Sequence, residues 1–393
     1  MVLEDLVVLV ITMITLGQII FCLPQLLTRA IQTQTYLPLA AFLTANGVIA
    51  LGPTIFLLLP AWGTVYIASI FPAWLLLGPT LWLYVEGLTS ENPWRLQKIH
   101  AVHTIPFLFG LIVAGMILSL PIEIRQHIFY DEIDINSGFP LVVVISIFLA
   151  MIMWALQSGY YVVRIALHLT KYRKRLKDLF ASNEQRELGW LSWVLIVTCL
   201  TWLFAFSSLS TTLVQDHSIF GYRFGTALLL ILVWTLAHWG LRQKPGFEGR
   251  YAHDSSSNDK SMTDNSDSKD NKKYQRSALD KAQSLRIADK ISKVMEVEEL
   301  HLDSSLSLQK LAQHVAIPPS YISQTLNETM GTNFFDFVNK WRIESAKPKI
   351  IANEDTVLNI ALEVGFNARS SFYKVFKKET GKTPTEYRKA HQA

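Results

Sequence analysis

Two kinds of hydrophobic pattern divide the chain. Long windows without Asp, Glu, Lys or Arg fill the first 241 residues, whereas after residue 277 apolar residues recur at intervals of three and four between charged positions. A helix needs about 20 apolar residues to cross ~30 Å of hydrocarbon, and the second window offers two such stretches on either side of Pro60. We therefore predict seven transmembrane helices. The uncharged windows are Leu6–Thr28, Ala30–Val85, Ile99–Ile122, Ile135–Val163, Leu188–Gln215 and Phe224–Leu241.

The distribution of charge supports this division. Residues 1–240 hold only 12 of the 36 Lys and Arg residues and 12 of the 32 Asp and Glu residues. Charge so sparse cannot cover a surface that faces water, which excludes a uniformly soluble protein. Glu4 and Asp5 stand where a signal peptide would be basic, so we expect an uncleaved first helix. The sequence thus predicts a transmembrane domain over residues 1–242.

Basic residues between the windows predict the orientation in the membrane. If the N-terminus lies outside, the inside segments carry 13 Lys and Arg residues and the outside segments carry only Arg125 and Arg223. Basic residues accumulate on the cytoplasmic side of membrane proteins. We therefore predict a multi-pass protein of the bacterial inner (cytoplasmic) membrane, with its N-terminus outside and its C-terminus in the cytoplasm.

A few polar residues lie inside or beside the predicted spans. Such groups need partners in hydrocarbon, so they either form a cavity for an unknown signal ligand or bond neighbouring helices; both interpretations stay open. No HExxH, GxSxG or phosphate-binding glycine motif is present in this part. We therefore expect no enzyme, no cofactor and no metal site. The polar candidates are Gln18, Asn46, His100, His103, Gln157 and His168.

The composition changes abruptly after the last window. Residues 253–273 contain one large apolar residue, Met262, among Ser, Asp, Asn and Lys. Such a segment cannot bury enough surface to offset the entropy of ordering. We predict a flexible polar linker over 243–276 with a typical reach of ~30 Å.

Helical periodicity returns in the C-terminal 117 residues. An amphipathic helix is predicted from about Ala278 to Leu300. Two helix-turn-helix patterns then follow, at about 306–331 and 356–381, joined by a predicted helix over Phe334–Ile351. In the first pattern Ser307 is a candidate N-cap and the Pro318–Pro319 pair separates the two helices. In the second, Gly365 makes the turn and Gly381 ends the helix.

These residues carry a family resemblance. The first half resembles an AraC/XylS-type DNA-binding domain at Leu306–Leu308, Leu311–Ala312, Tyr321–Ser323, Leu326–Asn327, Gly331–Phe334, Phe337–Asn339, Arg342–Ile343 and Ala346–Lys347. The second half resembles it at Ile360–Ala361, Val364–Phe366, Ser371–Phe372, Phe376–Lys378, Thr380–Gly381, Thr383–Pro384 and Tyr387–Arg388. The resemblance covers about 110 residues and implies an all-α protein: a seven-helix transmembrane bundle followed by a two-unit helix-turn-helix domain over 277–393. The stretch Gly78–Val85 is more loosely similar to membrane-embedded regulators of that family.

One position departs from the family pattern. Pro348 stands where aliphatic residues usually continue the connecting helix. A proline inside a helix removes a hydrogen bond and costs about 3 kcal/mol. We therefore expect a kink that alters the setting of the two units.

Helix faces predict which side chains contact DNA. In the first recognition helix Ile322 and Leu326 point inward, and similarity to the family places three of the outward residues at bases and the other two, Tyr321 and Asn327, at the backbone. In the second, Arg369 can bind guanine bidentately, while Lys374, Lys377 and Lys378 suit phosphates. The predicted DNA-contacting residues are Ser320, Tyr321, Ser323, Gln324, Asn327, Arg369, Ser370, Tyr373, Lys374 and Lys377.

Together these patterns predict a membrane-bound one-component transcription regulator. The transmembrane part would sense an unknown signal, and the C-terminal domain would bind a bipartite double-stranded DNA site and recruit or block RNA polymerase; a homodimer is one option for its assembly. The alternative is a transporter or membrane enzyme with a fused regulatory DNA-binding domain. A third interpretation is a passive membrane anchor from which proteolysis in the linker releases the DNA-binding domain.

Overall fold

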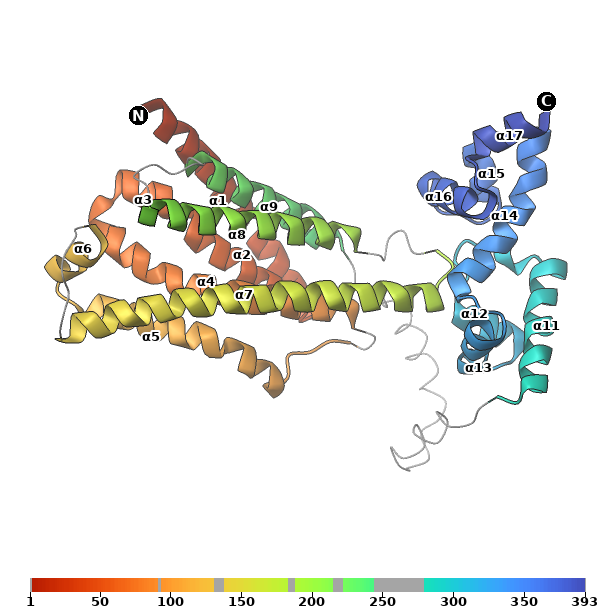
Figure 1. Ribbon diagram of the computed structural model, residues 1–393, viewed down its shortest axis with the longest axis horizontal. Helices are drawn as coiled ribbons and strands as arrows, with labels where there is room; N and C mark the ends of the chain where they lie inside the picture. The colour runs from red at the N-terminus through yellow and green to blue at the C-terminus, as the bar shows by residue number, and fades with distance from the viewer. Residues whose placement is uncertain are drawn as a thin grey trace. The chain divides into compact units, whose positions relative to one another are not determined.

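The structure of the protein is a computed structural model that describes residues 2–90, 93–130, 138–182, 188–214, 222–243 and 279–392. The regular secondary structure of these residues is helical, apart from one isolated β-bridge, which confirms the predicted all-α class (Figure 1). They form two compact units. The first comprises Met1–His168 and Gly189–Ser261, and the second comprises Leu169–Leu188 and Met262–Ala393. Most of the predicted linker, from residue 244 onward, lies outside the described residues.

The first unit is a bundle of long apolar helices. Between α3 and α4 a short 3-10 turn, Pro60–Trp62, breaks the long second window at the predicted place, because Pro60 has no N–H to continue the helix. The helices are α1 (Val2–Gln32), α2 (Tyr36–Ala50), α3 (Gly52–Leu58), α4 (Gly63–Thr89), α5 (Ile105–Ser119), α6 (Ile122–Tyr130), α7 (Gly138–Leu179), α8 (Gly189–Val214) and α9 (Tyr222–Arg242).

The predicted count of seven spans is not reached in the described part of the chain, where six stretches are long and apolar enough to cross a membrane. In the window Leu188–Gln215 the apolar stretch found is the shorter Gly189–Thr201, although α8 itself continues to Val214. The six are Leu6–Gln32, Tyr36–Leu58, Pro60–Thr89, Lys98–Ser119, Gly138–Leu179 and Arg223–Arg242.

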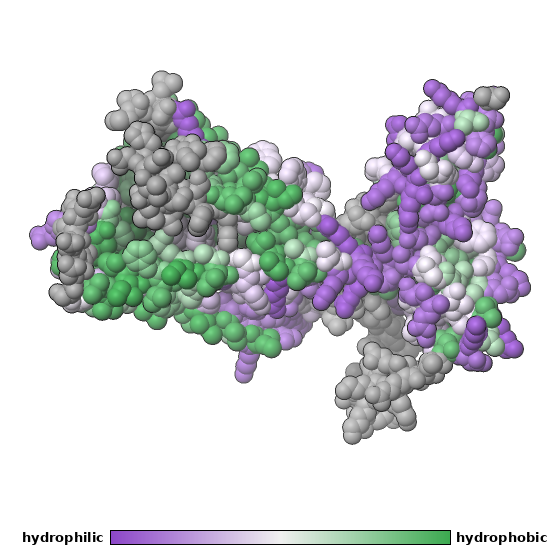
Figure 2. Space-filling model, in the orientation of Figure 1, coloured by the Kyte–Doolittle hydropathy of each residue, from purple (hydrophilic) through white to green (hydrophobic). Residues whose placement is uncertain are grey.

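The surface of the first unit is apolar. Large hydrophobic side chains such as Ile20, Phe21 and Leu156 are about 70% exposed on it, and Figure 2 shows these helices in green. A water-facing surface does not carry so many contiguous apolar side chains. The helices of this unit are therefore suited to lipid as their solvent.

The second unit contains the two predicted helix-turn-helix patterns. An amphipathic helix precedes them, and a further helix that the sequence did not predict follows them. The elements are α11 (Lys281–Val297), a 3-10 turn (Leu300–Leu302), α12 (Leu308–Val315), α13 (Pro319–Gln324), a π-helical turn (Thr325–Thr329), α14 (Phe334–Ala352), α15 (Val357–Glu363), α16 (Arg369–Thr380) and α17 (Pro384–Gln392).

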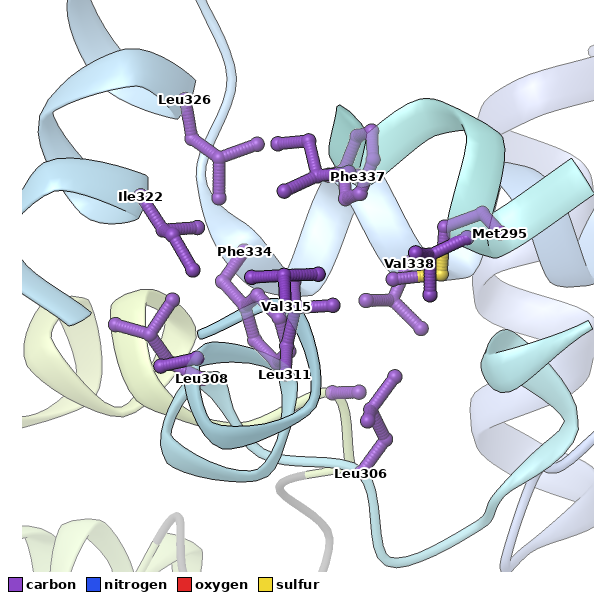
Figure 3. Close-up of a cluster of buried hydrophobic side chains, with 14 of the residues drawn as sticks. Met295, Leu306, Leu308, Leu311, Val315, Ile322, Leu326, Phe334, Phe337 and Val338 are labelled. Atoms are coloured by element: carbon purple, nitrogen blue, oxygen red, sulfur yellow. The ribbon is translucent and has the colours of Figure 1, made fainter. Parts of the chain in front are cut away.

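Two hydrophobic cores lie side by side along α14. The first packs α11, α12 and α13 against the N-terminal half of α14, and Figure 3 shows Leu311, Ile322, Leu326 and Val338 converging there. The second packs α15 and α16 against the C-terminal half, around Ile350. Figure 1 shows the two helix-turn-helix units at successive positions along this helix. Because α14 serves both cores, it is the element that separates the two units.

Local sequence signals explain where these helices begin and end. The Ser307 hydroxyl accepts a hydrogen bond from the Lys310 amide, so α12 has the N-cap that the sequence indicates. The Thr356 hydroxyl accepts one from the Asn359 amide and caps α15 in the same way. Gly365 and Gly381 have φ angles of +93° and +75°, a region that side chains rarely adopt. These residues position the recognition helices α13 and α16.

The structure adds detail at two points in this unit. Helix α14 continues through Pro348 to Ala352, close to the predicted end of the connecting helix at Ile351, so the proline does not end the helix before Ile350 joins the second core. The first recognition helix is not uniformly α-helical, because a π-helical turn forms at Thr325–Thr329 and the Met330 amide bonds the Thr325 carbonyl at 3.0 Å.

Candidate nucleic-acid interface

The first recognition helix buries one face and exposes the other. Ile322 and Leu326 are fully buried, as predicted, and hold α13 and the π-helical turn against the first core. Ser320 and Asn327 are exposed on the opposite face. Asn327 Nδ2 donates to the carbonyl of Ser323 at 2.9 Å, which fixes its side chain along the helix.

The other three candidates of this helix are half-buried. Gln324 Nε2 donates to the Glu328 carboxylate at 2.9 Å, while Tyr321 packs partly against the first core. Ser323 contacts the Asn327 amide at 3.4 Å. All five predicted residues therefore belong to one short helical segment, and Ser320 and Asn327 are its most accessible polar groups.

The second recognition helix, α16, presents a basic face. Phe372 and Phe376 are fully buried, as predicted, and anchor the helix in the second core. Arg369 is exposed in the first turn of α16, where its Nη2 donates to the Tyr373 hydroxyl at 3.1 Å and its guanidinium lies 5.0 Å from the centre of that ring. Tyr373 thus supports an extended Arg369 side chain over the helix surface.

Lysines continue the same surface. Lys374 and Lys377 are exposed, whereas Lys378 forms an ion pair of 2.7 Å with Asp336 of α14. Ser370 is exposed beside Arg369. Residues 356–393 carry seven basic and three acidic residues, so this part of the surface has the positive charge that phosphates attract.

A buried polar cluster that the sequence analysis did not single out lies behind these faces. Arg342 is fully buried on α14 and donates to the carbonyls of His301 and Asp303 at 2.7 and 2.8 Å. His301 is also buried, with Nδ1 donating to the Met295 carbonyl at 2.9 Å and Nε2 bonded to the Ser345 hydroxyl at 2.8 Å. The only sequence signal was Arg342 in the family pattern, because its partners are far away in the chain.

A cavity opens between the helices of the first unit. About 820 Å³ between its lining residues is free of protein atoms, including the space that is open to solvent. Its lining is mostly apolar, with Trp74 and Trp154 stacked at 5.1 Å and with the polar residues Asn46, Ser158 and Tyr161 on its walls. Such a mixture of aromatic walls and a few polar groups is typical of small-molecule sites.

Only some of the polar residues that the sequence analysis singled out in the spans lie at this cavity. Asn46 lines it, and His103 reaches it indirectly because its Nδ1 lies 2.6 Å from the Tyr161 hydroxyl. Gln157 does not line the cavity, and its Nε2 donates to the Leu75 carbonyl at 2.8 Å. His168 bonds Thr89 at 2.7 Å, and His100 accepts a hydrogen bond from the Gln97 amide at 3.0 Å. Gln18 is half-buried on α1.

Comparisons with known proteins match the second unit. Residues 311–390 fit a family model described as a helix-turn-helix domain. Over 106 residues, 27% of this chain, the sequence is 38% identical to an uncharacterised HTH-type transcriptional regulator of Staphylococcus aureus (strain COL). Over 99 residues it is 32% identical to the regulatory protein PocR of Salmonella typhimurium (strain LT2). These matches span 14% and 33% of the two relatives.

A solved structure from Listeria innocua, described as a protein of unknown function, is 33% identical over 27% of this chain and 97% of its own, with a TM-score of 0.24. The two relatives are named as an HTH-type transcriptional regulator and as a regulatory protein, and the residues that fit the family model lie in the second unit. The C-terminal part of this chain is therefore an AraC-type helix-turn-helix domain.

Proposed function

We propose that this protein is a membrane-bound one-component transcription regulator that binds a bipartite DNA site. The observation that carries the proposal is the presence, within the described residues of one chain, of an AraC-type helix-turn-helix domain and of six apolar helices long enough to span a membrane. The excess of basic residues in the inside loops favours a cytoplasmic C-terminus in the bacterial inner membrane. DNA and membrane lipid are the primary partners, and RNA polymerase and a second copy of the chain are further ones.

The two recognition helices would enter successive major grooves. Helix α14, which separates them, has 19 residues and is therefore ~28 Å long. Successive major-groove faces on one side of B-DNA lie ~34 Å apart. The length of α14 is close to this spacing, which supports binding of both units of one protomer to one face of the duplex.

Each predicted contact has a distinct role in this proposal. Ser320, Ser323 and Gln324 would face bases and Tyr321 and Asn327 the backbone, by similarity to the family. In α16, Arg369 would bind guanine, with Ser370 and Tyr373 beside it. Lys374 and Lys377 would neutralise phosphates, since they are exposed and stand on the basic face. Lys378 is a weaker candidate because it already pairs with Asp336.

A pair of substitutions tests these roles. We expect Arg369→Ala to relax specificity at one base position by ~1–3 kcal/mol. Lys377→Ala, the matched control on the same face, should weaken binding to all sequences alike and lower the salt dependence by about one phosphate contact. The measurement is competition binding by the full chain in lipid nanodiscs, with duplexes selected from a random pool by the unaltered chain. If the unaltered chain selects no sequence at physiological salt, the proposed function is wrong.

The cavity of the first unit is the proposed site for the signal. Its aromatic walls and sparse polar groups suit a largely apolar small molecule with one or two hydrogen-bonding groups. We expect Ser158→Leu, which fills the cavity from α7, to abolish the response of a reporter promoter while DNA affinity stays unchanged. Ser146→Leu, also on α7 but away from the cavity lining, should leave the response intact. Equal responses in both variants would contradict a sensing cavity.

Two other roles for the membrane part predict different experimental results. Turnover of a solute in proteoliposomes would favour a transporter or membrane enzyme with a fused regulatory domain. A soluble DNA-binding fragment on immunoblots of fractionated cells would favour a passive anchor that is cleaved. Several spans exceed what anchoring requires, which favours sensing.

A further inference from the structure

The residues that follow α7 are built into the second unit. Phe180 forms an antiparallel bridge with Ser307, and the Ala181 amide donates to the Leu306 carbonyl at 3.3 Å. The side chain of Ala181 is 1% exposed and belongs to the first core. The segment 180–182 therefore pairs with the backbone directly before α12 and is not simply a surface loop.

Two buried polar side chains of α14 hold the same segment. Asn339 Nδ2 donates to the Ala181 carbonyl at 3.1 Å. Arg342 Nη1 lies 3.5 Å from that carbonyl and 3.2 Å from the Ser182 hydroxyl. Asn339 and Arg342 are 1% and 0% exposed. Buried polar groups need hydrogen-bond partners. The Ala181 carbonyl is such a partner for both Asn339 and Arg342.

Arg342 also contacts the backbone before the first helix-turn-helix unit and the turn of the second. It donates to the carbonyls of His301 and Asp303, which precede the first unit. Its guanidinium lies 5.5 Å from the centre of the Phe366 ring, in the turn of the second unit. Arg342 stands on α14 between Val338 of the first core and Ile343 of the second. One side chain thus joins the segment to the boundary between the two units.

The segment is also continuous with a candidate span. Helix α7 runs unbroken from Gly138 to Leu179, directly before Phe180, and it is long and apolar enough to cross a membrane. The polar stretch 243–276, in contrast, has the composition of a flexible tether. A stiff helix that ends in a docked segment transmits displacement, which a flexible tether does not.

We propose that segment 180–182 is an intramolecular partner of the DNA-binding domain, which fixes the two helix-turn-helix units relative to each other through Arg342 and couples them to α7. The coupling role rests on the proposed DNA-binding function, but the docking itself does not.

The test uses the full chain in nanodiscs, first without DNA. Ala181→Pro removes the N–H that bonds Leu306, whereas the control Ala181→Ser keeps it. We expect hydrogen exchange of amides at 300–308 and 339–343 to rise roughly tenfold in the proline variant only. Asn339→Ala should give the same pattern without a new proline. Unchanged protection at Phe372–Phe376 verifies folding. Equal protection in the proline, serine and Asn339→Ala variants would overturn the docking.

DNA binding then tests the coupling. On duplexes selected by the unaltered chain, Ala181→Pro should weaken binding to the two-half-site duplex roughly tenfold, because the two units on α14 are no longer held in one relative orientation. Binding to a single half-site should stay unchanged. Faster exchange with unchanged two-site affinity would overturn the coupling but keep the docking. If the unaltered chain selects no duplex, the proposed DNA-binding function fails, and the exchange result still decides the docking.

Discussion

Substitution of Gly365 by alanine tests the packing between the two helix-turn-helix units. Gly365 forms the turn between α15 and α16, with φ at +93°. A Cβ at this position would lie 2.7 Å from the Leu302 carbonyl oxygen, 2.9 Å from the His301 carbonyl oxygen and 3.0 Å from Arg342 Nε. Two of these neighbours are backbone atoms, which cannot rotate away. The turn therefore requires glycine both for its dihedral angle and for its close contacts.

The expected cost has two parts. A positive φ in a residue with a side chain costs about 1–2 kcal/mol. Overpacking against fixed neighbours adds about 1–3 kcal/mol. Gly381 provides the matched control, since its φ of +75° is similar but a Cβ there would have nothing within 4 Å. We therefore expect Gly365→Ala to destabilise the domain by about 1–3 kcal/mol more than Gly381→Ala.

Hydrogen exchange of the full chain in nanodiscs measures this difference. The amides of Phe372 and Phe376, at the centre of the second core, report the free energy of opening of this domain. The difference corresponds to roughly 5- to 150-fold faster exchange in Gly365→Ala than in Gly381→Ala at equal temperature and pH. Equal exchange in the two variants would refute the close contact between the Gly365 turn and the carbonyls of His301 and Leu302.

Two further predictions concern single side chains of the same domain. Ser307→Ala removes the N-cap of α12 and should destabilise the domain by about 1 kcal/mol, measured by the same exchange method, whereas Ser307→Asp, which keeps a capping oxygen, should retain most of the stability. Burial lowers the pKa of His301 below its usual 6.5, in spite of the hydrogen bond to the Met295 carbonyl, which raises it. The folded state therefore holds His301 neutral and the unfolded state takes up the proton, so the stability that this residue provides is present above pH ~6.5 and is lost as the pH falls toward the folded-state pKa. We expect denaturant titrations between pH 7.5 and 5.5 to show this loss, and His301→Gln to reduce it; an unchanged pH profile in that variant would contradict the assignment.

Local signals in the sequence predicted much of the second unit. Ile322 and Leu326 recur at helical spacing and are buried, and Ser307 caps its helix as expected. Gly381 ends α16 in the left-handed conformation that favours glycine. Each of these features depends on residues within one or two turns, so periodicity and capping rules suffice to find them.

Long-range contacts could not be predicted in the same way. Arg342 bonds Asp303, 39 positions away, and contacts Ser182, 160 positions away. No periodicity links such residues, because only tertiary packing brings them together. The π-helical turn at Thr325–Thr329 also follows from packing, since its residues have no composition that marks it. Of the polar residues in the predicted spans, the sequence could not tell that Asn46 lines the cavity and that Gln157 bonds a neighbouring carbonyl.

In the proposed function, a membrane-embedded chain binds DNA sequence-specifically with two helix-turn-helix units that pack on α14. Hydroxyl-radical footprinting with the full chain in nanodiscs, on a duplex that it selects from a random pool, tests this claim most directly. We expect two protected patches on one face of the duplex, ~34 Å apart from centre to centre, and both should persist at physiological salt. A single patch, or uniform protection that does not depend on sequence, would contradict the account.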